Sequence, residues 1–285
     1  MIKRISKIKD LLFDLSIWRR AWVVPGLIFA AGNTVLTFIE LKCKTTLFFI
    51  LLVFLIIYFV GYFIKASGLK GVTLNIEGSS IVVESGDIFQ QDADSYKVIA
   101  FNEFFDTKVD DNLISASSLN GMYLLNNYPN DNDIIDFDNR VRNDPRLQMK
   151  EEGVHRRLGG KSTKYELGSI FKDKDYFLVA FSKFNDKNEA NLRLAEYATC
   201  LIKFWDEVNA LYNRKTVILP LLGSGITRHK DFNASNQELL EVILWTFKIS
   251  KVKFREPSKV KIVIHESQIG DINFYKLKEF ETNGI

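Results

Sequence analysis

The sequence is poor in the residues on which metal centres and disulfide frameworks depend. It has two cysteines, Cys43 and Cys200, and three scattered histidines in 285 residues, with no CxxC pair. A structural zinc site needs about four Cys or His ligands at short spacings, and a disulfide framework needs several cysteine pairs. The composition excludes such a framework, disfavours a zinc site and fits a reducing compartment for the C-terminal part.

Charged residues are missing from two stretches near the N-terminus. Ala21 to Ile39 and Thr45 to Ile64 contain no Asp, Glu, Lys or Arg. Because an α-helix rises about 1.5 Å per residue, about 20 apolar residues cross a hydrocarbon core of roughly 30 Å. The second stretch lacks the polar face that a soluble helix of this length would have. It therefore predicts a transmembrane helix.

The first stretch is less apolar, because it contains Pro25, Asn33 and two threonines. Its small residues favour packing against another helix. One interpretation is a transmembrane hairpin with spans at about 21–39 and 45–64. The alternative is a cleaved signal peptide with Ala30-Ala31-Gly32 near the cut. The short loop before the second stretch favours the hairpin.

Positive charge is concentrated before the first stretch. Residues 1–20 hold six basic and two acidic side chains, so the rest of the chain, whose total is +3, sums to −1. Basic segments beside spans stay in the cytosol, which predicts a cytosolic leader at 1–20 and a cytosolic domain at 68–285. The near-neutral domain argues against nucleic acid as a partner.

Strand-like and helix-like runs alternate from Gly68 onward, with a hairpin turn expected at Gly78-Ser79. Short apolar runs predict strands buried on both faces, and Glu189–Tyr212 and Gln237–Phe247 predict amphipathic helices. This alternation is typical of an α/β domain with a covered, parallel or mixed sheet. The expected strands are Val72–Ile76, Ser80–Glu84, Lys97–Phe101, Tyr176–Phe181, Thr216–Pro220 and Val260–Ile264.

A glycine turn follows one of these strands in the sequence TVILPLLGSGITR. The glycines of Gly223-Ser224-Gly225 allow positive φ and a close approach of the backbone. Consecutive N–H groups at such a turn can bind phosphate oxygens. No lysine stands in the Walker A position, so the turn is not a P-loop. Taken alone, it is equally consistent with a simple tight turn.

Two other strand ends carry polar residues. Asp87, in IVVESGDIF, could cap a helix, which is the commoner fate, or accept from an amine such as adenine N6. Asn102 precedes an acidic and aromatic loop and then the Ser- and Gly-rich turn Ser115–Gly121, which could face the GSG turn across a cleft. Glu103 and Asp106, in that loop, could be structural residues bonded to backbone amides.

In this order and spacing, the three segments resemble a macro domain over about residues 70–280. That family has a Gly-Asp-Ile triplet after a strand, matched by Gly86-Asp87-Ile88, and a strand ending in Asn before a first ligand loop. A later strand ends in Pro before a glycine loop for the diphosphate, matched by Pro220 and Gly223–Thr227. The resemblance implies a three-layer α/β/α domain with a mixed sheet that binds an ADP-ribose-type nucleotide.

A narrower resemblance is to macro-domain proteins of Thoeris-type bacterial anti-phage systems. It is carried by NEFFDTKVDD with SLNG, and by KYELGSI, LVAFSKF and PLLGSGI. Two N-terminal spans match the membrane-bound effectors of that group. The resemblance implies a multi-pass effector in the bacterial inner membrane that senses an ADP-ribose derivative, such as an amino-acid conjugate. A TIR-domain partner that consumes NAD would make this signal, and the effector would then oligomerise and disrupt the bilayer.

The resemblance also implies roles for individual residues. Asp87 would hold the adenine amine, Asn102 would lie near the distal ribose, and the two loops would wrap the diphosphate and that ribose. Arg228 could neutralise phosphate charge or be a solvated side chain. The implied ligand-binding residues are Asp87, Ile88, Asn102, Ser115, Ala116, Ser118, Gly121, Gly223, Ser224, Gly225, Ile226, Thr227 and Arg228.

One position departs from hydrolytic macro domains. Those that hydrolyse ADP-ribose esters of glutamate carry Asp after a glycine loop of this type, where this chain has Thr227. General acid–base catalysis needs a titratable group near the reacting bond, and nothing singles out Glu103, Asp106 or Asp231. We therefore expect a receptor without catalytic residues, metal or cofactor. A membrane-tethered ADP-ribosyl hydrolase and a plain interaction module remain alternatives.

Overall fold

The computed structural model describes residues 11–38, 44–156, 159–185, 189–225, 228–229 and 234–282. Contacts within the chain divide it into two compact units, one of Met1–Val72 with Gly270–Ile285 and the other of Thr73–Ile269. The sequence-based ranges placed 68–285 in one domain, whereas this division groups the last residues with the N-terminal helices. Of the predicted leader, residues 1–10 lie outside the described residues.

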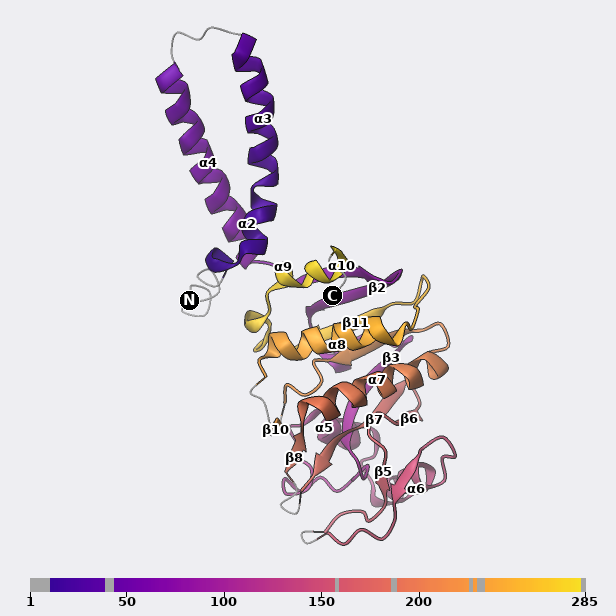
Figure 1. Cartoon of the computed structure of the whole chain (residues 1–285). Coiled ribbons are helices and arrows are strands. Elements are labelled where there is room, and N and C mark those ends of the chain that lie inside the picture. Colours follow the sequence, from indigo (N-terminus) through magenta and orange to yellow (C-terminus); the bar gives the residue numbers. More distant parts are fainter. Residues whose placement is uncertain are drawn as a thin grey trace. The chain divides into compact units, whose positions relative to one another are not determined.

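The first unit contains helices α2 (Leu15–Ala21), α3 (Val23–Phe38) and α4 (Lys44–Ser67) (Figure 1). Among the described residues, one helix is long and apolar enough to cross a membrane, over Thr46–Ser67, and almost none of its apolar window is buried. The 16 residues of α3 extend about 24 Å at 1.5 Å per residue, which is short of a core of roughly 30 Å. The second predicted span is therefore supported, and the first is not confirmed.

Aromatic contacts join α2 to α4 in this unit. The ring of Trp18 lies 5.2 and 5.1 Å from those of two phenylalanines of α4, Phe59 and Phe63. The C-terminal residues belong to the same unit, because the Asn273 side chain donates to the Asp14 carboxylate at 2.8 Å. The elements of this segment are η2 (Ile269–Asp271), α9 (Phe274–Leu277) and α10 (Glu279–Thr282).

The second unit is built on a mixed sheet, in which nine strands are counted among the described residues. In spatial order these are β1-β2-β11-β9-β3-β7-β8-β10, with β6 beside β7. The run from β2 to β7 is parallel, and both β6 and β8 pair with β7 antiparallel. The strands are β1 (Gly71–Ile76), β2 (Ser79–Ser85), β3 (Ser95–Asn102), β6 (Ile170–Asp173), β7 (Tyr176–Phe184), β8 (Ala190–Leu192), β9 (Thr216–Pro220), β10 (Arg228–His229) and β11 (Val260–Ile264).

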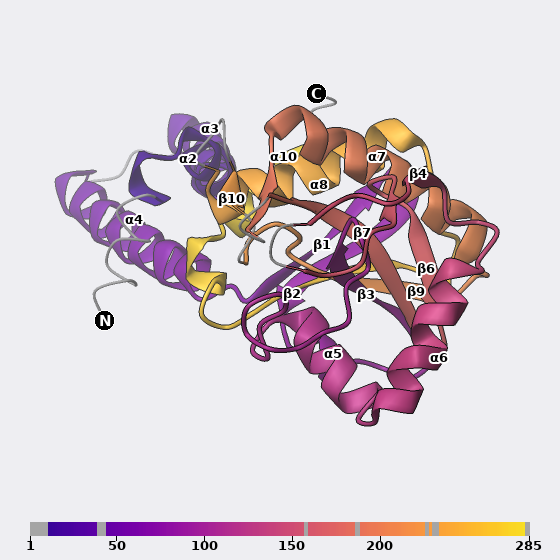
Figure 2. The same cartoon turned by 90° about the horizontal axis from the view of Figure 1, so that it is seen from below.

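All six predicted strands are present, and the sheet is mixed and covered on both faces. Figure 2 shows α7 (Leu194–Leu211) and α8 (Asn236–Ser250) on one side of the sheet. On the other side it shows α5 (Leu119–Asn127) and α6 (Asp131–Arg142). This burial explains why β3, β7 and β11 are continuous apolar runs rather than alternating ones. A separate pair of strands, β4 (Met149–Glu151) and β5 (Lys164–Tyr165), lies outside the main sheet.

Two sequence-based boundaries were wrong. Helix α7 begins at Leu194 rather than at Glu189, because residues 190–192 form β8 and the Glu196 carboxylate accepts from the Arg193 N–H at 3.0 Å. The hairpin between β1 and β2 turns at Glu77 and Gly78, whose φ angles are 52° and 79°. Two positive φ angles are typical of the type I′ turn that matches strand twist.

Candidate functional site

A cavity of about 560 Å³ opens where the parallel strands end. Its lining comes from the last residues of β3, β7, β9 and β11 and from the segments that follow β2, β3, β9 and β11. Ligands of open α/β sheets bind at this edge, because the connections diverge there. The volume lies within the roughly 300–1,000 Å³ of small-molecule sites.

The cavity brings together residues from all three predicted segments. Those that line it are Asp87, Ile88, Asn102, Ser115, Ser118, Gly223, Ser224 and Gly225. Ala116 and Gly121 are not among its lining residues. Arg228 lies in β10 opposite Asn191 of β8, and Ile226 and Thr227 lie outside the described residues.

Asp87 caps a short helix and still presents a carboxylate oxygen. Its Oδ1 accepts from the Phe89 N–H at 2.9 Å at the start of η1 (Ile88–Gln90). Gln91 donates to the Asp87 backbone carbonyl at 2.8 Å and so fixes the turn. In the part of the chain that is described, Oδ2 has no hydrogen-bond partner. One oxygen thus fixes the side chain while the other can accept from a ligand amine.

The turn at 115–121 forms the N-terminus of α5. Ser118 caps the helix, since its Oγ accepts from the Gly121 N–H at 3.2 Å and donates to the Ser115 carbonyl at 2.5 Å. The N–H groups of Leu119 and Asn120 have no acceptor among the described residues. A helix N-terminus with unpaired N–H groups favours an anion. This wall of the cavity therefore suits a phosphate group.

The glycine turn Leu221–Gly225 also lines the cavity. Gly223 has φ of +84°, and the Ser224 hydroxyl donates to the Leu221 carbonyl at 2.7 Å. Gln268 donates to the Ser224 carbonyl at 3.2 Å. The Tyr197 hydroxyl donates to the Leu222 carbonyl at 2.9 Å, so side chains hold the turn at both Leu222 and Ser224. A Cβ added at Gly225 would meet no atom of the described residues within 4 Å.

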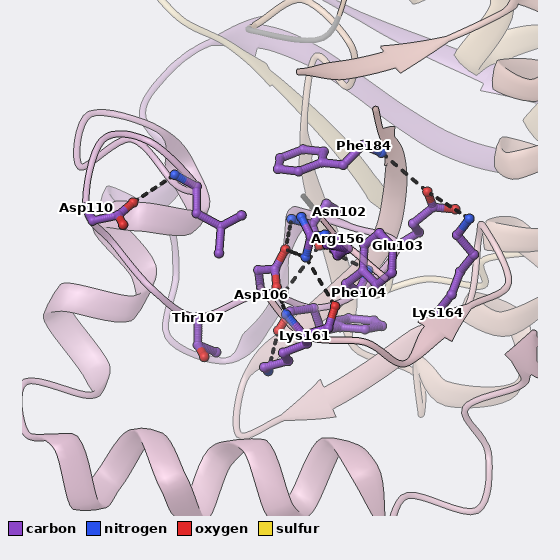
Figure 3. A network of polar contacts seen from close by, with 12 residues as sticks. Asn102, Glu103, Phe104, Asp106, Thr107, Asp110, Arg156, Lys161, Lys164 and Phe184 are labelled. Atoms are coloured by element: carbon purple, nitrogen blue, oxygen red, sulfur yellow. Dashed lines mark hydrogen bonds and ion pairs between the residues drawn. The ribbon is translucent and has the colours of Figure 1, made fainter. Parts of the chain in front are cut away.

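Asn102 lines the cavity, but its polar atoms hold the following loop (Figure 3). Its Oδ1 accepts from the N–H groups of Phe104 and Asp106 at 3.0 and 3.3 Å. Its Nδ2 donates to the Asp106 carboxylate at 2.9 Å. The amide group of Asn102 therefore binds residues of its own loop. Contact with a ribose alone would not require these bonds.

Glu103 and Asp106 do not line the cavity, and Asp231 lies outside the described residues. Asp106 is fully buried and pairs with Arg156 at 2.5 Å. Glu103 is also buried, and its Oε1 accepts from the Phe184 N–H at 3.3 Å (Figure 3). Burial raises the pKa of Glu103, although Lys164 at 3.7 Å opposes the shift. Both carboxylates take the structural role considered from sequence.

The carboxyl end of β11 was missed by the sequence analysis. Val263, His265, Ser267 and Gln268 all line the cavity, and His265 Nδ1 lies 2.8 Å from the Ser267 hydroxyl. The strand itself was predicted, but its place was not. It lies between β2 and β9, the two strands that precede Asp87 and Gly223. Knowledge of the strand order would therefore have placed the carboxyl end of β11 in the site.

Matches to known proteins cover most of the chain. The family described as "Thoeris protein ThsA, Macro domain" matches residues 81–265. The Thoeris protein ThsA of Bacillus amyloliquefaciens (strain Y2) is 46% identical over 281 residues, which cover 98% of this chain and 94% of that protein. A solved macrodomain mutant from Oceanobacillus iheyensis aligns at a TM-score of 0.45 and 11% identity, covering 75% of this chain and 95% of that one. By the first two matches, the chain belongs to the Thoeris ThsA family, and residues 81–265 match that family's macro domain.

Proposed function

We propose that this chain is a membrane effector of a bacterial Thoeris anti-phage defence system and that its macro domain binds an ADP-ribose-derived signal. The observation that carries the proposal is the shared cavity, which collects Asp87, the N-terminus of α5 and the Gly223 turn. A carboxylate can accept from the amine of adenine, and the helix N-terminus can stabilise a diphosphate. The two groups of one nucleotide thus have complementary partners in one site.

The proposed signal is an ADP-ribose derivative, such as an amino-acid conjugate, made by a TIR-domain partner that consumes NAD. Family membership supports this part of the proposal, because the relative from Bacillus amyloliquefaciens is a Thoeris protein. Receptor function is favoured over hydrolysis by the environment of the carboxylates. Asp87 and Asp111 accept backbone N–H bonds, while Glu103 and Asp106 are buried away from the cavity.

The proposed output is oligomerisation and disruption of the inner membrane. Helix α4 supports a membrane location, with the N-terminus and the macro domain in the cytoplasm. A ligand shifts a protein toward an assembling state only if it binds that state more tightly. Small residues of α3, namely Gly26, Ala30, Ala31 and Gly32, would allow close helix contacts in the assembly.

Binding and output are tested on the full-length protein. Isothermal titration calorimetry in detergent with ADP-ribose and with amino-acid conjugates of ADP-ribose measures the affinity. Asp87→Asn is the informative variant, because Asn still caps a helix but lacks the charge. It should weaken binding about tenfold, as expected for a lost hydrogen bond to a charged group, and leave the melting temperature nearly unchanged.

Dye leakage from liposomes that contain the protein measures the output. Leakage should rise when the ligand is added and remain low for Asp87→Asn. Equal leakage with and without ligand would contradict the switch. Release of free ADP-ribose from a modified protein would instead support the hydrolase alternative.

A further inference from the structure

A buried ion pair lies behind the wall of the cavity rather than in it. Asp106 is fully buried, and the side chain of Arg156 is 7% exposed, with 2.5 Å between Nη1 and Oδ2. The other carboxylate oxygen, Oδ1, accepts from the Lys161 backbone N–H at 2.8 Å. Arg156 and Lys161 come from the connection between β4 and β5, about fifty residues further along the chain. Two distant segments are therefore joined through one carboxylate.

The same carboxylate reaches the ligand site through Asn102. Asn102 is the last residue of β3, lines the cavity and donates to Asp106 Oδ2 at 2.9 Å. The pairing register with β7 shifts between Phe101 and Asn102, so the chain leaves the regular sheet at this point. The loop that follows supplies most of its lining residues between 111 and 118, namely Asp111 to Ser115, Ser117 and Ser118. Asp106 thus fixes the path on which the first ligand loop begins.

The connection between β4 and β5 is shaped to approach this carboxylate. Gly160 has φ of +108°, and a Cβ there would lie 2.1 Å from Arg156 Nη1 and 3.0 Å from Asp106 Oδ1. The Arg156 guanidinium lies 4.1 Å from the centre of the Phe104 ring, which is a cation–π contact. Lys161 donates to the Phe105 carbonyl at 2.5 Å. Three successive residues of the loop, Phe104 to Asp106, therefore each contact Arg156 or Lys161 (Figure 3).

Stability alone is a weak reason for this arrangement. A buried ion pair loses the solvation of both charges, and well-packed apolar residues of similar volume often stabilise a protein as well or better. A polar network does specify one geometry, because an incorrect arrangement leaves buried charges unpaired. Binding to a loop that is already ordered avoids the entropic cost of ordering it.

We propose that Asp106 and Arg156 are positioning residues of the nucleotide site, which hold the loop after Asn102 in its binding conformation without touching the ligand. This inference rests on the proposed function, because it concerns the affinity of the same cavity. It adds Arg156 and Lys161, from the connection between β4 and β5, to the residues on which that affinity depends.

A second carboxylate–arginine pair in the same unit provides a control. Asp173 is 1% exposed and pairs with Arg140 at 2.6 Å. It also accepts from the hydroxyls of Tyr123 and Tyr128. Neither member of this pair lines the cavity. Arg140→Gln removes one arginine from a buried carboxylate, as Arg156→Gln does, without loosening the loop after Asn102.

The test compares full-length variants in detergent, titrated with ADP-ribose. Arg156→Gln should weaken binding at least about tenfold, a change that one or two newly mobile side chains or a flexible loop would produce. Arg140→Gln should lower the melting temperature and leave the affinity within about twofold of wild type. Asp106→Asn combined with Arg156→Gln removes both charges and should recover part of the lost affinity. If Arg156→Gln lowers only the melting temperature, the positioning role is wrong.

Hydrogen–deuterium exchange of the ligand-free protein supplies a readout that needs no ligand. Amides of residues 103–118 should exchange faster in Arg156→Gln than in wild type or in Arg140→Gln, because the loop opens more often. Unchanged exchange in that loop would overturn the proposal even if affinity fell. If wild type binds neither ADP-ribose nor its conjugates, the proposed function fails, and the exchange experiment still decides whether the pair orders the loop.

Discussion

Two of the loops that line the cavity are built differently. The loop from Asn102 to Gly121 is fastened by the buried ion pair of Asp106 and Arg156, by the Ser118 cap and by Lys161, which donates through its backbone N–H and its side chain. The turn Leu221–Gly225 is held by hydrogen bonds of the Ser224 hydroxyl, of Gln268 and of the Tyr197 hydroxyl, and among the described residues no atom lies within 4 Å of a Cβ built at Gly225. We call the first loop the fastened wall, because a buried ion pair holds it, and this turn the adjustable wall, because hydrogen bonds hold it and its tip has room to move.

This difference suggests a division of work in nucleotide recognition. An ordered wall lowers the entropic cost of binding and fixes where the phosphates lie. An adjustable wall can close on the ligand, and a closure that differs between the free and bound states is what a switch requires. Changes in the first wall should therefore act on folding and affinity together, whereas changes in the second should act mainly on affinity.

The largest expected effect comes from Gly160→Ala, which breaks the fastened wall. The new methyl group would have to displace Arg156 from Asp106 and would hold an L-residue at φ of +108°. Left-handed strain and overpacking together should lower the free energy of unfolding by about 3 kcal/mol. Chemical denaturation of the full-length protein measures it.

The neighbouring glycine is a matched control. Gly159 has φ of +79°, and a Cβ there would meet no atom of the described part of the chain within 4 Å. Gly159→Ala should therefore cost only the strain of about 1 kcal/mol. If the two variants lost equal free energy of unfolding, the close approach of Gly160 to the ion pair would not contribute to stability.

Gly121→Ala and Gly225→Ala compare the two walls directly. Alanine normally stabilises a helix by about 1 kcal/mol relative to glycine. At Gly121 this gain is reversed, because the Cβ would lie 2.1 Å from the Ser115 carbonyl oxygen. A net loss of about 2 kcal/mol follows from overpacking. Gly225→Ala should leave thermal stability unchanged and reduce only the affinity for ADP-ribose. Similar losses of stability in both would remove the distinction between the walls.

Gln268→Ala tests the fastening of the adjustable wall. It removes the hydrogen bond to the Ser224 carbonyl, which is worth about 1 kcal/mol or less because the groups are half-buried. The affinity for ADP-ribose should change about threefold, and the melting temperature should hardly move. A loss of stability as large as that of Gly121→Ala would show that this turn is also preformed.

The sheet and the helical layer of α7 and α8 were predictable, since continuous apolar strands and amphipathic helices follow from local pattern. The layer of α5 and α6 was implied only by the resemblance to macro domains. The glycine turn and Asp87 were also found, because each directly follows a predicted strand. The part played by His265 and Gln268 was not, because strand order is set by long-range pairing that a single sequence does not display. Asp106 was recognised as a candidate structural residue, but its partner Arg156 is fifty residues away and carries no local signal.

The smallest expected effect concerns Glu103 in the fastened wall. Burial raises the pKa of Glu103 above its ordinary value, so its contribution to stability is present at low pH and is lost as the pH rises through the raised value. Glu103→Gln cannot ionise, and it can still accept from the Phe184 N–H. Its stability relative to wild type should therefore improve between pH 4.5 and pH 7 in thermal unfolding at constant salt.

Glu196→Gln should show the opposite sign. Burial alone would raise the pKa of Glu196, but hydrogen bonds from Lys183 and from the Arg193 N–H lower this pKa below its ordinary value. Its ionised form therefore stabilises the protein, in a contribution that is lost as the pH falls through the lowered value. Glu196→Gln should be less stable than wild type at pH 7 and approach it at low pH. If Glu103→Gln instead followed the same trend, the Lys164 contact would outweigh burial, and the fastened wall would rest on two favourable ion pairs rather than on Asp106 and Arg156 alone.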